Sequence, residues 1–145
     1  MESDFGWAVQ VMATTFQRWG MPAVEHLPGG PRGYLVLAAI SQGRLRSQLA
    51  LARHLGVDKT VMTYLLDKME EAGLVTRRPD PADRRARTIL ITPAGKRALA
   101  KARDDLSQTE SRLLSALTPE QAETFRDLLE LIARDVHEQQ NGRGD

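Results

Sequence analysis

Apolar residues recur three and four positions apart over residues 4–20, and this spacing predicts an amphipathic helix with a wide apolar stripe. The stripe consists of Trp7, Ala8, Val11, Met12, Thr15, Phe16 and Trp19. The run Gly20-Met21-Pro22 is expected to end the helix, because proline cannot continue the backbone hydrogen bonding. A connector rich in Pro and Gly follows over residues 26–31, and a short apolar helix is predicted over residues 34–41.

Two short helices joined by a tight turn are predicted in the middle of the chain. Ser47 is suited to cap a helix over residues 48–55, and Gly56 is suited to end it. Asp58 can cap a second helix over residues 59–72. The apolar face of this second helix consists of Met62, Leu65, Leu66 and Met69. This pattern is typical of a helix-turn-helix, whose second helix is the one that enters the major groove of DNA.

A two-stranded hairpin is predicted after the helix-turn-helix. Residues 74–78 and 86–92 indicate strands, with Ile89 and Ile91 on one face of the second strand and Leu90 on the other. Residues 79–85 between them are polar and rich in turn formers. A helix-turn-helix followed by such a hairpin is a winged helix, and the hairpin loop is its wing.

Two long helices complete the predicted structure. The first begins at Thr92-Pro93 and repeats apolar residues close to a heptad spacing, and the second begins with a capping box at Thr118. The apolar face of the second is Phe125, Leu128, Leu129, Ile132 and Val136, and residues 138–145 are expected to be a polar, frayed tail.

The apolar stripes of the first helix and of the last two helices exceed what one chain can cover. These helices can pack on one another, and a second copy of the chain is expected to bury the remainder; a monomer in which they simply complete the core is the alternative. We therefore predict a mainly α (α+β) fold. Residues 31–103 form a winged helix-turn-helix DNA-binding domain, and residues 1–30 and 104–145 form a helical dimerisation region.

Charge is distributed unevenly along a chain whose net charge is only +1. Residues 77–103 hold nine basic and two acidic groups, whereas residues 104–145 hold four basic and ten acidic groups. A basic block of this kind is typical of a surface that faces a polyanion, although a solvated arginine-rich loop would give the same composition.

Several classes of protein are disfavoured by composition. The chain of 145 residues has no cysteine, no apolar run long enough to span a membrane and no basic-then-apolar leader at its N-terminus, so we expect a cytoplasmic protein without disulfides. No catalytic set of residues can be assembled from the motifs, so we expect no enzymatic activity and no cofactor. The three histidines are scattered at His26, His54 and His137, and we expect no metal site.

Motifs in the central segment resemble the MarR (multiple antibiotic resistance regulator) family. The resemblance is carried by Gly73-Leu74-Val75 with Arg77, by Asp83 with Arg85, and by Ile91-Thr92 with Gly95, over about 50 residues in order. It implies a homodimeric winged-helix regulator that binds a pseudo-palindromic operator on double-stranded DNA. It also implies a repressor that a small aromatic or phenolic ligand releases from DNA.

DNA-contacting residues are expected on the second helix of the motif. With its apolar face turned inward, Lys59, Thr60, Val61, Thr63, Tyr64 and Lys68 point outward, and Ser47 lies nearby at the preceding cap. Hydroxyl and methyl groups suit base edges, and the two lysines suit phosphates. Many family members carry arginine where Tyr64 stands; tyrosine cannot make the bidentate guanine contact, so the base preference at this position stays open.

The wing supplies three further basic residues. By resemblance, Asp83 orients Arg85 at the wing tip, from which Arg85 is placed to enter the minor groove, while Arg84 and Arg87 bind phosphates. Arg77, just before the loop, can serve either as a DNA contact or as a structural ion-pair partner.

Four aromatic residues are expected near the junction of the dimerisation and DNA-binding regions. Trp7, Phe16, Trp19 and Tyr34 can line a pocket for the effector, or can simply belong to the core. The function predicted from the sequence is thus a ligand-responsive transcriptional repressor. The alternative is a winged helix that mediates protein–protein interaction and has no operator.

Overall fold

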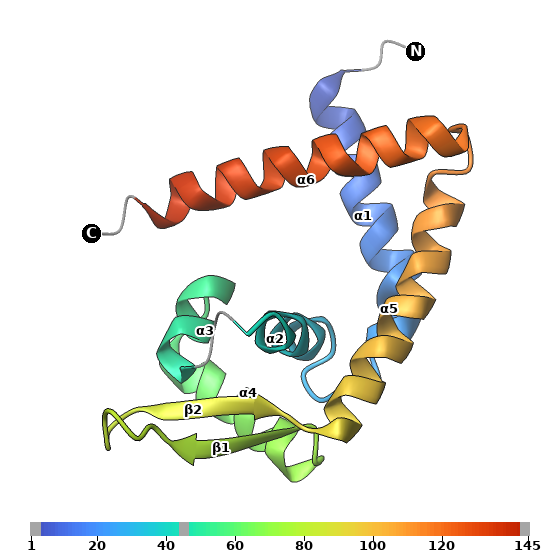
Figure 1. Ribbon diagram of the computed structural model, residues 1–145. Helices are drawn as coiled ribbons and strands as arrows, with labels where there is room; N and C mark the ends of the chain where they lie inside the picture. The colour runs from blue at the N-terminus through green and yellow to red at the C-terminus, as the bar shows by residue number, and fades with distance from the viewer. Residues whose placement is uncertain (1–3, 44–46, 143–145) are drawn as a thin grey trace. The chain divides into compact units, whose positions relative to one another are not determined.

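The computed structural model describes residues 4–43 and 47–142, which form six helices and one two-stranded sheet within those ranges (Figure 1). The chain divides into two compact units, Met1–Thr109 and Glu110–Asp145. The elements in chain order are α1 (Phe5–Val24), α2 (Pro31–Ser41), α3 (Gln48–Leu55), α4 (Lys59–Glu71), β1 (Val75–Pro79), β2 (Arg87–Ile91), α5 (Pro93–Leu113) and α6 (Pro119–Asn141).

The predicted winged helix is confirmed element by element. Strands β1 and β2 are antiparallel, with Val75 opposite Ile91 at one end and Pro79 opposite Arg87 at the other. Ser47, just before α3, forms an isolated bridge with Thr88 and so ties the start of the helix-turn-helix to the sheet. The fold is therefore mainly helical with a small sheet, in the order that the hydrophobic pattern predicts.

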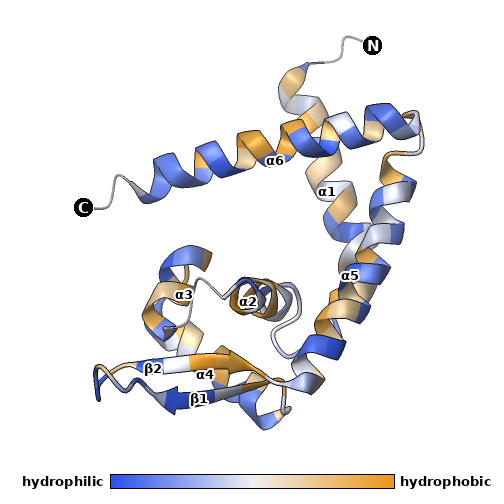
Figure 2. Ribbon diagram, viewed as in Figure 1, coloured by the Kyte–Doolittle hydropathy of each residue, from blue (hydrophilic) through white to orange (hydrophobic). Residues whose placement is uncertain are grey.

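The core of the first unit lies between α2, α3, α4 and the sheet. Its largest fully buried side chains are Leu37, Leu51, Met62, Leu66, Met69, Ile89, Val36 and Val75. Figure 2 shows hydrophobic residues on α2 and on the end of β2 next to α5, whereas the loop end of the hairpin is hydrophilic. Complete burial of a side chain of this size stabilises a fold by about 1.5–3 kcal/mol, so these contacts hold the helix-turn-helix and the wing in a fixed arrangement.

The end of the first helix differs from the prediction. Helix α1 continues through Gly20 and Pro22 to Val24 instead of ending at residues 20–22. Proline lacks the N–H that would bond one turn back, and a proline in a helix interior costs about 3 kcal/mol or more. Ala23 and Val24 are buried in the core immediately after the proline, and this burial favours keeping the last turn helical.

Two other boundaries also extend beyond the prediction. Helix α2 begins at Pro31, three residues before the expected start, with the proline in the first turn where a missing N–H costs nothing. Helix α6 reaches Asn141, so residues 138–141 are helical and not a frayed end, while residues 143–145 lie outside the described part. The capping box at Thr118 is confirmed, because its side chain accepts from the Gln121 N–H and the Gln121 side chain accepts from the Thr118 N–H.

The second unit consists of the end of α5 and the whole of α6. Within it Leu114 and Ala122 are buried, and Arg126 forms an ion pair with Glu110. The apolar side chains further along α6 remain exposed: Leu128, Leu129, Leu131, Ile132 and Val136.

Candidate nucleic-acid interface

Local capping and core packing fix the orientation of α4. The Ser47 hydroxyl accepts a hydrogen bond from the Ala50 N–H at 3.0 Å, which caps α3, and Gly56 ends α3 with a left-handed φ of 64°. Asp58 stands at the N-cap of α4 as expected, but its side chain makes no capping hydrogen bond. The four predicted core residues of α4 are all buried, so the opposite face of the helix is turned to solvent.

Every residue of α4 that was expected to face DNA is exposed: Lys59, Thr60, Val61, Thr63, Tyr64 and Lys68. The Tyr64 side chain is 65% exposed, and the Lys68 ammonium lies 5.4 Å from the centre of its ring. This distance is typical of a cation–π contact, which restrains both side chains on the outer face. The α4 face therefore presents two cations, hydroxyls, a methyl-bearing side chain and one aromatic ring.

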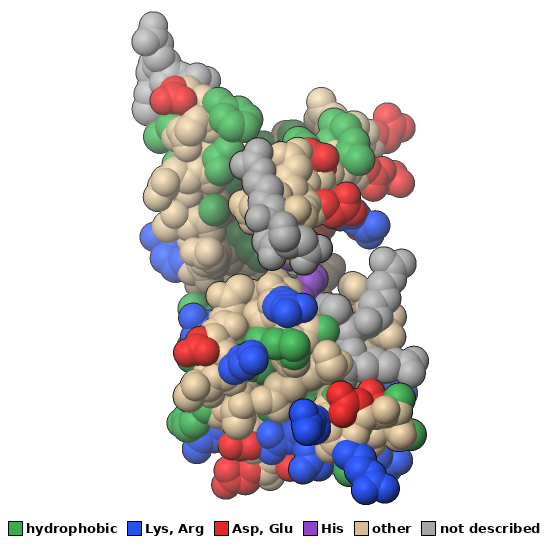
Figure 3. All heavy atoms as spheres, turned by 90° about the vertical axis from the view of Figure 1, so that its left-hand side faces the viewer, with side chains coloured by type: hydrophobic (Ala, Val, Ile, Leu, Met, Phe, Trp, Pro, Cys, Tyr) green, Lys and Arg blue, Asp and Glu red, His purple; other side chains and the backbone are tan. Residues whose placement is uncertain are grey.

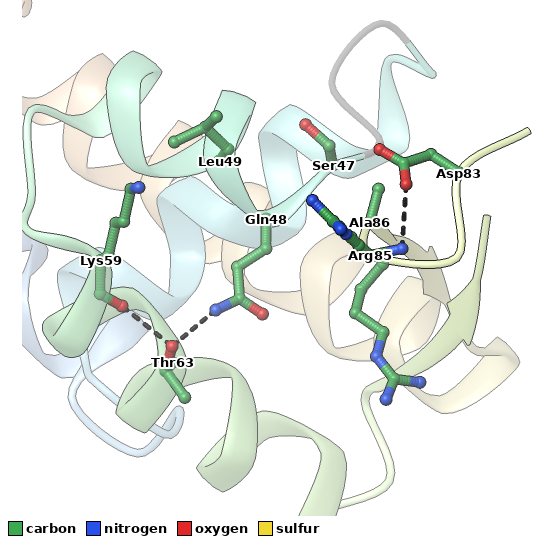
Figure 4. A pocket seen from close by; sticks show the side chains of 9 residues that line it. Ser47, Gln48, Leu49, Lys59, Thr63, Asp83, Arg85 and Ala86 are labelled. Carbon is green, nitrogen blue, oxygen red and sulfur yellow. Dashed lines mark hydrogen bonds between the residues drawn. The ribbon is translucent and has the colours of Figure 1, made fainter.

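The Thr63 hydroxyl makes two hydrogen bonds, one of them with Gln48, a residue that the sequence prediction missed. Its hydroxyl donates to the Lys59 carbonyl at 2.9 Å and accepts from the Gln48 side-chain amide at 2.6 Å (Figure 4). Gln48 is the first residue of α3, so the contact joins the two helices of the motif on their outer side. Fifteen residues separate the pair in sequence, and no local pattern pointed to it.

Arg84, Arg85 and Arg87 are exposed on the wing, as expected. The Asp83 carboxylate accepts a hydrogen bond from the Arg85 backbone N–H at 2.9 Å. Asp80 similarly accepts from the Ala82 N–H at 2.9 Å. The two carboxylates thus hydrogen-bond to the backbone of the loop that carries Arg85, and the orientation of the Arg85 side chain by Asp83 stays a prediction.

Of the two roles considered for Arg77, the structure supports that of a structural ion-pair partner. Its guanidinium pairs with Asp67 and with Glu70, the latter at 3.3 Å, and its backbone N–H donates to Glu70 at 2.9 Å. The hydrogen bond from Arg77 is the main cause that lowers the pKa of Glu70. Partial burial opposes the charge on Arg77, but the hydrogen bonds to Asp67 and Glu70 outweigh it and raise the pKa of Arg77. This cluster fastens β1 to α4.

A shallow hollow of about 430 Å³ lies between the helix-turn-helix and the wing (Figure 4). Its lining comes from the start of α3, from the first half of α4 and from the wing, and consists of Ser47, Gln48, Leu49, Lys59, Thr63, Asp83, Arg85, Ala86 and Arg87. Figure 3 shows several Lys and Arg side chains, with Asp and Glu side chains among them, over the part of the surface where the hairpin and the helix-turn-helix lie. Of the predicted DNA-contacting residues, the hollow brings together Ser47, Lys59, Thr63, Arg85 and Arg87. The others are exposed and do not line it: Thr60, Val61, Tyr64, Lys68 and Arg84.

Comparison with known proteins agrees with this geometry. The model of the MarR family matches residues 31–86, from the start of α2 to the end of the wing loop. The winged-helix segment of this chain belongs to the MarR family.

Solved MarR-family structures have the same fold over nearly the whole chain. A structure of MarR is 19% identical and covers 97% of this chain and 96% of its own, with a TM-score of 0.82. Wild-type MarR from E. coli in its apo form is 21% identical over 91% of this chain and 98% of its own, with a TM-score of 0.77. CouR, a transcriptional repressor bound to a 23-mer DNA duplex, is 25% identical over 90% and 92%, with a TM-score of 0.75. These similarities show the fold that the chain shares with the solved structures.

The four aromatic residues proposed for a ligand pocket lie on α1 and α2. Trp7 and Phe16 are 49% and 37% exposed, Trp19 is half-buried, and Tyr34 packs partly against the core. None of the four lines the hollow beside the wing. An effector site at these residues stays a prediction.

Within residues 4–43 and 47–142, no group of three or more His, Asp or Glu side chains is placed to hold a metal ion. Over the same ranges, no helix has the length and the apolar character needed to cross a bilayer.

Proposed function

We propose that the protein is a sequence-specific transcriptional repressor that binds a pseudo-palindromic operator as a homodimer. The observation that supports the proposal is the hollow in which Lys59 and Thr63 of α4 lie together with Arg85 and Arg87 of the hairpin. A helix with a polar outer face fits the major groove, and a hairpin beside it can follow the backbone into the neighbouring minor groove.

The residues of α4 divide into phosphate and base contacts. Lys59 and Lys68 bind phosphates, which supplies affinity without sequence preference. Thr60 and Val61 offer a hydroxyl and methyl groups to base edges and thymine methyls. Tyr64 presents a ring that Lys68 holds in place, so we expect it to contact the sugar–phosphate edge or a thymine methyl and not a guanine.

In the wing, Arg85 enters the minor groove, where narrow A·T-rich tracts concentrate negative potential. Arg84 and Arg87 bind phosphates on either side, and Ser47 adds a hydroxyl contact near the start of α3. The hydrogen bonds of Asp80 and Asp83 to the loop backbone support this role, because they order the segment that carries the arginine.

The homodimer is proposed from uncovered apolar surface in each unit. In the first unit, α1 leaves Phe5 85% exposed and also exposes Trp7, Val9 and Val11. In the second unit, α6 leaves Leu131 66% exposed together with its neighbours. Exposed apolar surface of this kind is a common site of association with a protein partner. A two-fold partner would also present a second α4 about 34–36 Å away, which is one turn of DNA.

Repression, release by a ligand and a cytoplasmic location complete the proposal. The family resemblance favours a small aromatic or phenolic effector, and Trp7, Phe16, Trp19 and Tyr34 are the residues that we assign to it. Such a ligand must bind the DNA-incompetent arrangement more tightly, and DNA must reciprocally weaken the ligand. A compound that binds the protein without changing its affinity for the operator would contradict this part.

Selection of bound sequences from random duplexes tests the proposal. We expect an inverted repeat whose half-sites are centred one helical turn apart, bound by two chains per duplex. Recovery of no enriched sequence, from a protein that also fails to retain duplexes in dilute buffer, would contradict it and would favour the protein-interaction module.

A further inference from the structure

The side chain of Gln48 connects the two helices of the helix-turn-helix. Gln48 is the first residue of α3, and its side-chain nitrogen lies 2.6 Å from the Thr63 hydroxyl oxygen on α4. Both side chains line the hollow that Lys59, Arg85 and Arg87 also line. The amide of Gln48 therefore lies over the middle of α4, on the face turned away from the core (Figure 4).

The hydrogen bonds of Thr63 fix which way the Gln48 amide is turned. A threonine hydroxyl has one proton, and that of Thr63 is donated to the Lys59 carbonyl at 2.9 Å. The hydroxyl can therefore only accept from Gln48, which requires the amide nitrogen to face Thr63. Figure 4 shows this nitrogen turned towards Thr63, with the amide oxygen on its other side.

The remaining hydrogen-bonding groups of Gln48 match one base. After one N–H is given to Thr63, the amide keeps one N–H donor and its oxygen acceptor. Adenine offers the complementary pair in the major groove, an acceptor at N7 and a donor at N6.

We propose that Gln48 is a specificity-determining residue that reads one adenine in each half-site, and that Thr63 is its positioning residue. This inference rests on the proposed function, since it assigns a base contact within the same interface. It also changes the role expected for Thr63, whose hydroxyl positions the Gln48 amide instead of contacting a base itself. The helix that precedes α4 thus contributes directly to sequence recognition.

A base contact fits Gln48 better than a phosphate contact. The amide is neutral, and its outward oxygen is an acceptor that a phosphate oxygen would repel. Lys59, Arg85 and Arg87 line the same hollow and supply the positive charge for the backbone. Gln48 is the uncharged group among them that has a donor and an acceptor side by side.

The experiment uses the full-length chain and the duplex obtained by the selection described above. Affinities are measured for that duplex and for a set in which each A·T pair of a half-site is replaced in turn by G·C. The variants are Gln48→Ala, Gln48→Glu, Thr63→Val and Thr63→Ser, and the control is Gln108→Ala at an exposed position on α5.

We expect the wild type and Gln108→Ala to bind about tenfold to a hundredfold more weakly when one particular A·T pair is replaced. Gln48→Ala should lose this discrimination at that pair and keep it at the others. Gln48→Glu should prefer a cytosine there, because a carboxylate accepts from the cytosine amino group. Thr63→Val should weaken the discrimination without abolishing DNA binding, and Thr63→Ser, which keeps the hydroxyl, should restore it.

Two results would overturn the inference while leaving the proposed function intact. One is an unchanged preference at every position in Gln48→Ala. The other is a uniform loss of affinity for all duplexes, which would make Gln48 a phosphate contact. A wild type that shows no sequence preference at all would instead contradict the proposed function itself.

Discussion

Gly95, in the first turn of α5, allows this helix to pack closely against the backbone at Leu74, just before β1. A Cβ added at this position would lie 2.1 Å from the Leu74 carbonyl oxygen and 2.8 Å from a side-chain carbon of Ile91. The Leu74 oxygen also accepts the Thr92 N–H at 3.0 Å. The Thr92 hydroxyl donates to the Gly73 carbonyl at 2.6 Å and accepts from the Gly95 N–H at 3.0 Å. The clash in Gly95→Ala is therefore with backbone that hydrogen bonds hold in place.

The magnitude follows from two opposing effects. Alanine is favoured over glycine in a helix by about 1 kcal/mol, which is the most that the substitution can gain. Overpacking against an interior typically costs about 1–3 kcal/mol, and a backbone oxygen at 2.1 Å cannot rotate away as a side chain can. We expect a net loss of about 1–2 kcal/mol, which corresponds to a fall in melting temperature of roughly 3–8 °C for a chain of this size.

Urea unfolding followed by circular dichroism, at one fixed protein concentration, measures this loss. The matched control is Gly6→Ala in the first turn of α1, where an added Cβ would meet only the Asp4 carboxylate oxygen, at 3.5 Å. The control should be neutral or stabilising by up to about 1 kcal/mol. A Gly95→Ala protein as stable as the wild type would refute the reasoning that this close approach fixes the base of the hairpin on α5.

Three further substitutions test separate parts of the account. Arg85→Ala should weaken operator binding by about 1–3 kcal/mol, whereas Arg32→Ala at an exposed position on α2 should leave it unchanged, as a filter-binding titration can measure. Arg77→Gln should reduce the loss of stability at low pH. Arg77 lowers the pKa of Glu70 in the folded state. The ionised Glu70 therefore contributes stability above its unfolded pKa, and this contribution is lost as the pH falls through its folded pKa. Urea midpoints between about pH 6 and pH 3 should therefore fall less in Arg77→Gln than in the wild type, and parallel curves would contradict this. Thr118→Ala should cost about 1 kcal/mol through the lost cap of α6, and an equal effect from Thr124→Ala would argue against capping as the cause.

The sequence was sufficient for elements whose signals are local. Ser47 and Gly56 bound α3 through the capping chemistry of their own residue types, and the spacing of Met62, Leu65, Leu66 and Met69 placed the inner face of α4. Pro22 was misleading because its local effect is to end a helix, while the burial of Ala23 and Val24 depends on the tertiary structure.

The candidate interface was predictable in outline and not in its internal contacts. Exposed positions on α4 and the basic wing follow from periodicity and charge, and they lie where they were expected. The choice between two roles for Arg77 required knowing that β1 lies beside α4, since Asp67 and Glu70 are 10 and 7 residues away in the chain. The hydrogen bond between Gln48 and Thr63 likewise depends on how α3 packs on α4, which no pattern within either helix encodes.

The central claim is that α4 and the wing both bind phosphates of the same duplex. The salt dependence of duplex binding tests it most directly. A plot of log affinity against log salt should fall steeply for the wild type, because each neutralised phosphate releases counterions. Lys59→Ala on α4 and Arg84→Ala on the wing should each reduce the slope by about 1, and the double variant should reduce it by about 2. A wild type that binds no duplex in dilute buffer, or a slope that neither substitution changes, would contradict the account.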